Sequence, residues 1–292
     1  MFSITAFAAL APNQQYLQSV QAITGYNQFI TGQSAPSGLP NDPAIVQATS
    51  ALTQSRQVSL TWFNQVYPSC LNVPENITSE SGGITALLQE LTSVAGQFAS
   101  DPGNSQLAQA VASTAGQLAG EVNTLQLSCA GLGSTLSQYA TSLQQAAQGL
   151  LTCIGALQSL ISTEHATLCS DIAKLNSLQH ATCPNQGDIN AAERLVQNDQ
   201  QTINSTAGFA EQLNSCGQSA GGAVSGLNYL AAYWVQLASL ANTSLQALRQ
   251  ISGQPASVIP LDLQTASKAW QGLLDQLCAI TTLAAAEPLV AG

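Results

Sequence analysis

The sequence predicts an all-α fold, an elongated antiparallel bundle of about six to eight helices, several of them very long. Apolar residues recur at spacings of three and four along most of the chain, which is the period of one helix face. No window alternates between polar and apolar residues as a strand would. We therefore expect residues 1–292 to form a single elongated helical domain. Its long helices would occupy 42–179 and 188–287, and residues 180–187 would form a turn at one tip.

Residues 1–41 are expected to form an N-terminal segment and a linker. A helical stretch near 13–31 precedes TGQSAPSGLPND, which is rich in Gly, Ser and Pro. The next helix would begin at Asp42-Pro43. An aspartate can cap the free amides of a helix start, and proline suits the first helical position.

Two prolines interrupt the region that follows. Pro68 is expected to end the helix from Asp42, because proline has no amide hydrogen and clashes with the preceding turn. Pro74 would open another helix that runs to about residue 100. There Asp101-Pro102-Gly103 would turn the chain.

The most regular apolar stripe runs from Leu107 to Leu178 and has the spacing of helices packed nearly antiparallel. Beyond Ile161 the apolar stripe is predicted to continue through Cys169, Ile172, Leu175 and Leu178. The glycines at positions 131 and 133 are the expected break. A helix over 134–181 would then be about 70 Å long, which favours an elongated molecule.

The remaining turns divide the C-terminal part. Pro and Gly in 180–187 end one helix, and Asp188 is expected to cap the next. Four glycines dilute the pattern at 217–226, each costing about 1 kcal/mol in a helix. Prolines at both ends of 255–260 mark another turn, and the last helix is expected over 261–286.

The composition excludes several classes of protein. Only 7% of residues are charged, against roughly 25% in a typical soluble domain. The 5 Lys+Arg and 15 Asp+Glu give a net charge of −10. Binding to nucleic acid or to anionic lipid needs clustered basic residues, and the sequence has no such cluster. We expect no nucleic-acid partner.

The sequence contains no run of about 20 apolar residues that would predict a spanning helix. The longest apolar-biased segment, GLLTCIGALQSLI (149–161), contains Gln, Ser and Thr and suits a buried helix. The N-terminal MFSITAFAALAPNQ has no basic region typical of a signal peptide. It is interpreted as an uncleaved amphipathic tip or, alternatively, as the stub left by processing.

Seven cysteines leave disulfides and buried free thiols as equal alternatives. The pairs considered are Cys169–Cys183 and Cys183–Cys216, near the turn. A zinc site made of His165, Cys169, His180 and Cys183 is not favoured, because structural zinc sites usually hold two ligands on a tight knuckle. We expect no cofactor and no metal.

Nothing in the sequence indicates an enzyme. The two histidines lack the context of a nucleophile elbow, and no glycine-rich loop is followed by a lysine. Asp188, Glu193 and Asp199 are interpreted as a cap and a solvated face rather than an acid–base pair. Trp62, Trp234 and Trp270, each near the end of a striped run, are expected to anchor the ends of the bundle.

Three stretches resemble a known toxin family. VQATSALTQSRQVSLTWFNQVYPSCLNVPENITSESGGITALL (46–88) is similar to the opening of the haemolysin BL and non-haemolytic enterotoxin family, α-helical pore-forming toxins related to cytolysin A. SGLNYLAAYWVQLASLANTSLQAL and LDLQTASKAWQGLLDQL resemble its closing helices, each with a tryptophan in a leucine-spaced run. The C-terminal helices of Cry6- and xenorhabdolysin-type toxins have a similar pattern.

The resemblance implies a secreted protein with a small head at one end that carries an apolar hairpin, released at a target-cell membrane or receptor. It further implies self-oligomers and one or two partner toxin components. Neither 180–188 nor 217–226 is apolar enough to be that hairpin. The alternatives are the N-terminal segment, the 149–161 segment, or a component that never inserts alone. The candidate membrane-active residues are Phe2, Ile4, Phe7, Leu150, Leu151, Ile154, Leu157, Leu160 and Ile161.

Two other functions remain open. The first is a secreted, non-enzymatic helical scaffold or interaction protein, which the lack of a clear insertion hairpin favours. The second is a carrier or enzyme with a small molecule in the bundle core.

Overall fold

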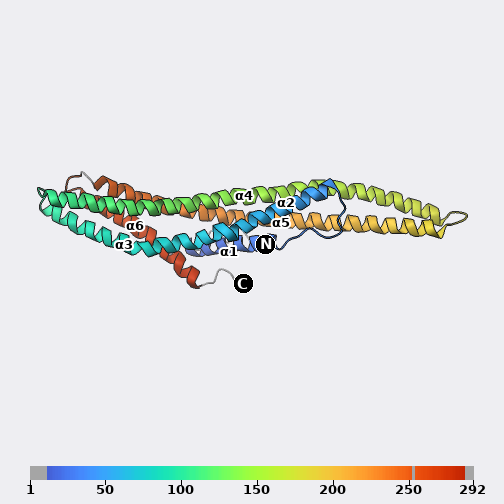
Figure 1. Ribbon diagram of the computed structural model, residues 1–292, viewed down its shortest axis with the longest axis horizontal. Coiled ribbons are helices and arrows are strands. Elements are labelled where there is room, and N and C mark those ends of the chain that lie inside the picture. The colour runs from blue at the N-terminus through green and yellow to red at the C-terminus, as the bar shows by residue number, and fades with distance from the viewer. Residues whose placement is uncertain (1–11, 252–253, 287–292) are drawn as a thin grey trace. The chain divides into compact units, whose positions relative to one another are not determined.

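The computed structural model describes residues 12–251 and 254–286, and the regular structure in these ranges is all helical. α2, η2 and α3 follow one another without interruption, so this part of the chain forms five continuous helical segments. The all-α prediction is confirmed, whereas the expected count of six to eight helices is not. In chain order the elements are α1 (Pro12–Thr31), α2 (Pro43–Thr61), the π-helix η2 (Trp62–Val66), α3 (Tyr67–Ser100), α4 (Ser105–Gln179), α5 (Gln186–Ile251) and α6 (Ile259–Ala286), as Figure 1 shows.

The chain divides into two units, and each is described by itself. Unit 1 comprises Met1–Ile23, Trp62–Ala140 and Ser225–Gly292. Unit 2 comprises Thr24–Thr61 and Thr141–Val224. In both units α4 and α5 pack against each other in antiparallel directions.

Neither Pro68 nor Pro74 bounds a helix, contrary to expectation. Pro68 is the second residue of α3, which follows η2 directly. Pro74 lies inside α3 and cannot donate to the carbonyl of Cys70 one turn earlier. The hydroxyl of Tyr16, on α1, donates to that carbonyl instead, with an O···O distance of 3.5 Å. A side chain from another helix therefore compensates for the proline.

The glycines expected to weaken α4 and α5 do not interrupt either helix. A Cβ atom on Gly133 of α4 would lie 3.4 Å from the carbonyl oxygen of Ala231 on α5. A Cβ atom on Gly226 of α5 would lie 3.3 Å from the carbonyl oxygen of Ser19 on α1. These glycines allow neighbouring helices of unit 1 to approach closely, and this packing offsets their low helix propensity.

The predicted turns are present, and asparagine or aspartate side chains cap the helices that follow. The amide of Ala44 donates to Asp42 Oδ1 at 2.7 Å, as expected. The amide of Gln106 donates to Asn104 Oδ1 at 3.1 Å. At the start of α5 the cap is Asn185, whose Oδ1 accepts from the Gly187 amide at 2.9 Å. Asp188, expected to be the cap, lies in the first turn of α5, where its negative charge interacts favourably with the positive end of the helix dipole.

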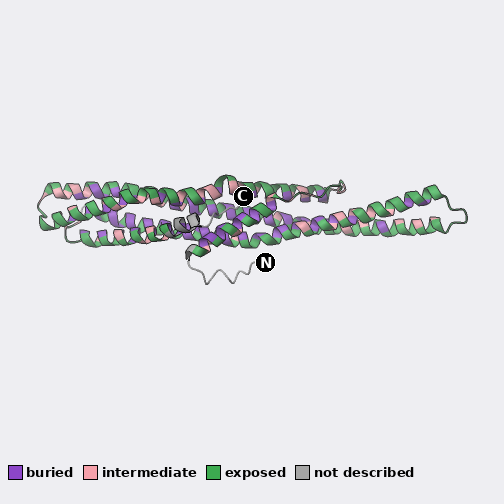
Figure 2. Ribbon diagram, turned by 90° about the horizontal axis from the view of Figure 1, so that it is seen from below, coloured by how far each residue is buried: buried purple, intermediate pink, exposed green. Residues whose placement is uncertain are grey.

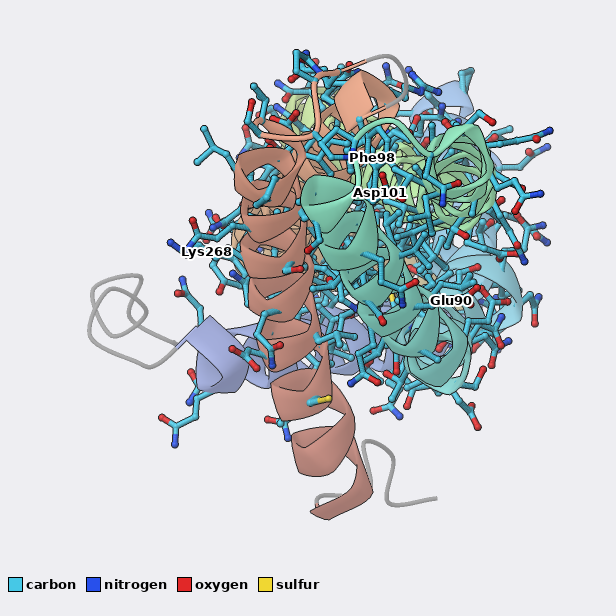
Figure 3. The ribbon with its side chains drawn as sticks, turned by 90° about the vertical axis from the view of Figure 1, so that its left-hand side faces the viewer. Glu90, Phe98, Asp101 and Lys268 are labelled. Carbon is cyan, nitrogen blue, oxygen red and sulfur yellow. The ribbon has the colours of Figure 1, made fainter. Side chains whose placement is uncertain are left out.

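Unit 1 has a core shared by several helices. Buried apolar side chains come from α1, α3, α4, α5 and α6. Figure 3 shows α3 and α6 side by side, with Glu90 and Phe98 on α3, Asp101 just after its end, and Lys268 on α6. Lys268 is exposed and points away from α3. The contact between these two helices is therefore not an ion pair through Lys268.

Unit 2 is built on the antiparallel pair of α4 and α5. Ser55 of α2 lies with its Oγ 3.4 Å from the carbonyl oxygen of Ala146 on α4. Gln212 of α5 donates from Nε2 to Gln33 Oε1 at 2.9 Å. Beyond these contacts, residues 160–203 form what we call the α4–α5 hairpin, two helices joined at their turn. Figure 2 shows its surface as mostly exposed.

Candidate functional site

The three tryptophans named from the sequence all lie in the core of unit 1. Trp62 and Trp234 are 0% exposed and Trp270 is 2% exposed. Trp62, the first residue of η2, stacks on Tyr139 of α4 with ring centroids 5.7 Å apart. Tyr67, in α3, lies 5.8 Å from the same ring. Their role as anchors at the ends of the bundle stays a prediction.

A second aromatic group joins α1 to α5 in the same unit. The rings of Tyr16 and Tyr233 lie 5.5 Å apart, and Tyr233 meets Trp234 edge-on at 6.5 Å. Burial raises the pKa of Tyr16 well above its usual value, so its hydroxyl keeps its proton and acts as a donor. Trp270 of α6 donates from Nε1 to Thr85 Oγ1 of α3 at 3.3 Å. These aromatic residues hold α1, α3, α5 and α6 together within unit 1.

The apolar segment 149–161 lies in α4 within unit 2. Leu150 and Leu157 are fully buried, whereas Leu151 is 36% exposed. Ile154, Leu160 and Ile161 are half-buried. Leu151 packs against α5 so tightly that a Cβ atom on Gly217 would lie 2.6 Å from its Cγ. In this structure the segment therefore turns its most apolar face toward the protein.

The other candidate membrane-active residues, Phe2, Ile4 and Phe7, lie outside the described residues. Among helices of the described part of the chain, none contains a stretch long and apolar enough to span a membrane.

The structure corrects the register of the stripe in the α4–α5 hairpin. Cys169 and Ile172, expected inward, are exposed, whereas Leu168 is buried and Asp171 is half-buried. The inward-facing positions of α4 therefore continue at heptad spacing from Leu157. Cys169 and Ile172 each lie one position after an inward-facing residue, so their predicted inward placement is wrong by one residue.

Asp199 is a carboxylate whose environment the sequence did not predict. It was expected on a solvated face, but its Oδ2 is buried and without a hydrogen-bond partner. Burial and the neighbouring charge of Asp171 raise its pKa. The signal was available, because Asp199 follows Val196 by three residues and precedes Ile203 by four.

The thiols considered for disulfides are unpaired. Cys169 and Cys183 are exposed, Cys216 is buried, and none of these three is in a disulfide. Burial raises the pKa of Cys70 and of Cys129 to about 12. Both thiols therefore stay protonated, which makes them poor nucleophiles and metal ligands.

No metal centre is assembled in residues 12–251 and 254–286, where no three His, Cys, Asp or Glu side chains come together in a way that could hold an ion. His180 lies at the end of α4 with Nδ1 2.8 Å from the Asn176 carbonyl oxygen. That contact gives Nδ1 a hydrogen-bond partner four residues earlier in the chain.

The fold has counterparts among solved structures, although no protein-family model and no curated protein matches the chain. YaxA from Yersinia enterocolitica is 11% identical with a TM-score of 0.60, over 91% of this chain and 96% of its own. XaxA from Xenorhabdus nematophila is 10% identical with a TM-score of 0.58, over 93% of this chain and 94% of its own. SmhA of the tripartite alpha-pore forming toxin Smh from Serratia marcescens is 13% identical with a TM-score of 0.49, over 97% and 95%.

The first two matches, at 10–11% identity, establish a shared fold: the chain has the fold of XaxA and YaxA over at least 91% of its length.

Proposed function

We propose that the chain is an α-helical pore-forming toxin or a component of a multi-part pore-forming toxin. It is secreted as a monomer, binds a target-cell membrane or receptor, and rearranges into oligomers there. The observation that carries this proposal is the match to XaxA and YaxA, which extends over at least 91% of this chain and at least 94% of theirs.

The composition of the surface supports a rearrangement of this kind. With only 5 Lys+Arg in 292 residues, few ion pairs oppose the separation of helices. Exposed Gln, Ser, Asn and Thr side chains also lose less on desolvation than charged ones. Helix faces of this kind can repack between two discrete arrangements, which is the element such a switch requires.

Two segments are proposed to meet the membrane. The first is the N-terminal segment with Phe2, Ile4 and Phe7. The second is 149–161, which would have to release Leu150 and Leu157 from the seam of unit 2. Burying apolar side chains contributes about 1.5–3 kcal/mol each, so this release needs compensating contacts with lipid or with a second copy.

The test is dye release from liposomes by the purified chain, alone and with the products of neighbouring genes, with negative-stain imaging of the same samples. Leakage with ring-shaped oligomers supports the proposal. Triple substitution of Phe2, Ile4 and Phe7 by Ser is compared with substitution of Leu150, Leu151 and Leu157 by Ala, each checked for helix content. Unchanged monomers and intact vesicles with every partner and target membrane would rule the proposal out.

The second candidate is a secreted helical scaffold or interaction protein. Burial of Leu150 and Leu157 favours it, because the most apolar helical segment is already covered by the chain's own helices. A stable complex with a protein partner, without leakage, is the outcome that would support this reading.

A further inference from the structure

The buried positions of α2 and α3 recur at multiples of seven residues, but the two series do not share one register. In α2 and η2 the buried positions form two series, Ile45, Leu52, Ser59, Val66 and Ala48, Ser55, Trp62. In α3 the matching series are Cys70, Ile77, Ile84, Leu91 and Pro74, Leu88, Ala95. Across η2 the spacing is eight residues, from Trp62 to Cys70 and from Val66 to Pro74. The chain therefore holds one residue more at this point than a repeat of seven requires.

The extra residue lies where the helix has π geometry. η2 spans Trp62–Val66, and the repeat changes directly after it. In a π-helix each amide pairs with the carbonyl five residues earlier instead of four, so one π turn holds one residue more than an α turn. In an α-helix that residue would rotate everything after it by about 100°. The π turn therefore absorbs the extra residue and keeps the buried face of α3 aligned with Trp62.

Contacts of unit 1 on both sides of the turn depend on this alignment. Before it, Trp62 is fully buried and its ring stacks on Tyr139 of α4. After it, Cys70 is 3% exposed and its carbonyl accepts from the hydroxyl of Tyr16 on α1. If the same residues formed a regular α-helix, α3 would be rotated relative to Trp62. One of these two sets of contacts would then be lost.

Pro68 favours the π form of the turn. In a regular α-helix the carbonyl of Asn64 would accept from the amide of residue 68, but proline has no amide hydrogen and its ring clashes with that carbonyl. With π spacing the same carbonyl would accept from the amide of Ser69, one residue later. A proline that weakens the α form thus lies two residues after the end of η2.

We propose that η2 is a conformational joint in unit 1, a turn with two forms that differ in the rotation of α3 relative to Trp62. In the π form, Trp62 and the buried face of α3 are packed at the same time. Conversion to a regular α-helix would rotate α3 by about 100° and shift it by about 1.5 Å along its axis, so one side of the joint would leave its partners. Packed helices favour two such discrete arrangements over gradual bending. The joint goes beyond the function proposed above and does not depend on it, because it concerns the chain free in solution.

The first test is deletion of Gln65, an exposed residue of η2, in the full chain. The deletion removes the extra residue, so a regular α-helix can keep both sides of the joint packed. It is made together with Pro68→Ala, because the proline would otherwise lie inside that helix. We expect the Tm of this variant to stay within about 3 °C of that of Pro68→Ala alone, measured by circular dichroism.

Deletion of Glu80 in the same Pro68→Ala background is the matched control. Glu80 is also exposed, but it lies between Ile77 and Ile84, where the repeat of seven has no extra residue. Whichever part of α3 shifts to close the gap, at least three buried positions lose their place. We expect this deletion to lower the Tm by at least about 10 °C.

Amide hydrogen exchange of the full chain, followed by mass spectrometry, tests the two forms directly. In the wild type we expect peptides within 60–70 to exchange at least about tenfold faster than α3 peptides within 77–95, because the turn can open and convert. Pro68→Ala alone keeps the extra residue and should keep this fast exchange. The added deletion of Gln65 should abolish it.

Two results would overturn the joint. The first is a loss of stability on deletion of Gln65 as large as that on deletion of Glu80. The second is wild-type protection within 60–70 equal to that of the α3 peptides. Neither result affects the vesicle test above.

Discussion

Unit 1 and the α4–α5 hairpin of unit 2 are built on the same spacing of apolar residues but differ in the number of helices that cover it. In unit 1, five helices contribute buried side chains, including all three tryptophans. In the hairpin, two helices pack on each other, and the inward positions include Glu164, Asp171 and Asp199. The comparison teaches that an apolar stripe predicts a helix face, whereas its energetic value depends on the partners that cover it.

Because fewer helices cover the hairpin, we expect it to open locally at a lower free-energy cost than unit 1. Regions with few buried apolar contacts open at a lower free-energy cost than a multi-helix core. In the hairpin Ile172 and Leu195 are 39% and 43% exposed, so they contribute little burial. The three predictions below concern, in turn, the burial of a side chain, the hydrogen bond that compensates for Pro74, and the glycines of α5.

The largest expected effect is from Trp234→Ala in unit 1. The side chain is 0% exposed and its loss would leave a large cavity, so unfolding free energy should fall by about 3–5 kcal/mol. Leu195→Ala in the hairpin is the control and should cost less than about 1 kcal/mol. Urea unfolding followed by circular dichroism measures both. Equal losses would show that the hairpin carries as much of the stability as unit 1.

A smaller effect is expected from Tyr16→Phe, which removes the donor to the Cys70 carbonyl. We expect a loss of about 1 kcal/mol, since the bond is long and the carbonyl is buried in unit 1. Pro74→Ala restores the helical amide that this carbonyl lacks, so Tyr16→Phe should cost less in that background. A double-mutant cycle from urea midpoints measures the coupling. Additive losses would mean that the tyrosine hydroxyl does not compensate for the proline.

The smallest effect is expected from glycine substitutions in α5 of unit 2. Gly222→Ala meets open space and should raise unfolding free energy by about 0.5–1 kcal/mol. Gly217→Ala should lose that gain, because its Cβ would lie 2.6 Å from Leu151. Thermal unfolding of the two variants gives the difference. An equal gain at both positions would show that Leu151 moves aside without cost and that this part of the α4–α5 contact is loosely packed.

Local signals predicted much of the fold. The cap at Asp42, the turns after Ser100 and Gln179, and the proline-bounded connection before α6 all follow from residues within a few positions of each boundary. The apolar stripe of α4 and α5 also predicts long helices, because its spacing of three and four residues persists over many turns.

The errors arose where a distant partner decides the outcome. Pro74 is tolerated because the hydroxyl of Tyr16, 54 residues before Cys70, donates to the Cys70 carbonyl, and Gly133 is favoured by close packing against α5. The charge of Asp199 predicts a solvent-facing side chain, whereas its spacing from Val196 and Ile203 places it in the stripe. The apolar character of Cys169 and Ile172 predicts inward positions, but the heptad register selects Leu168 and Asp171. In each case the deciding contact lies on another helix.

The bond between Tyr16 and the Cys70 carbonyl has a consequence for the order of folding. α3 cannot satisfy all of its own backbone near Pro74, so burying that turn before α1 arrives would leave a polar group without a partner. The two helices are therefore expected to complete their structure together, late and cooperatively, even though each would be a local element if judged from its own residues.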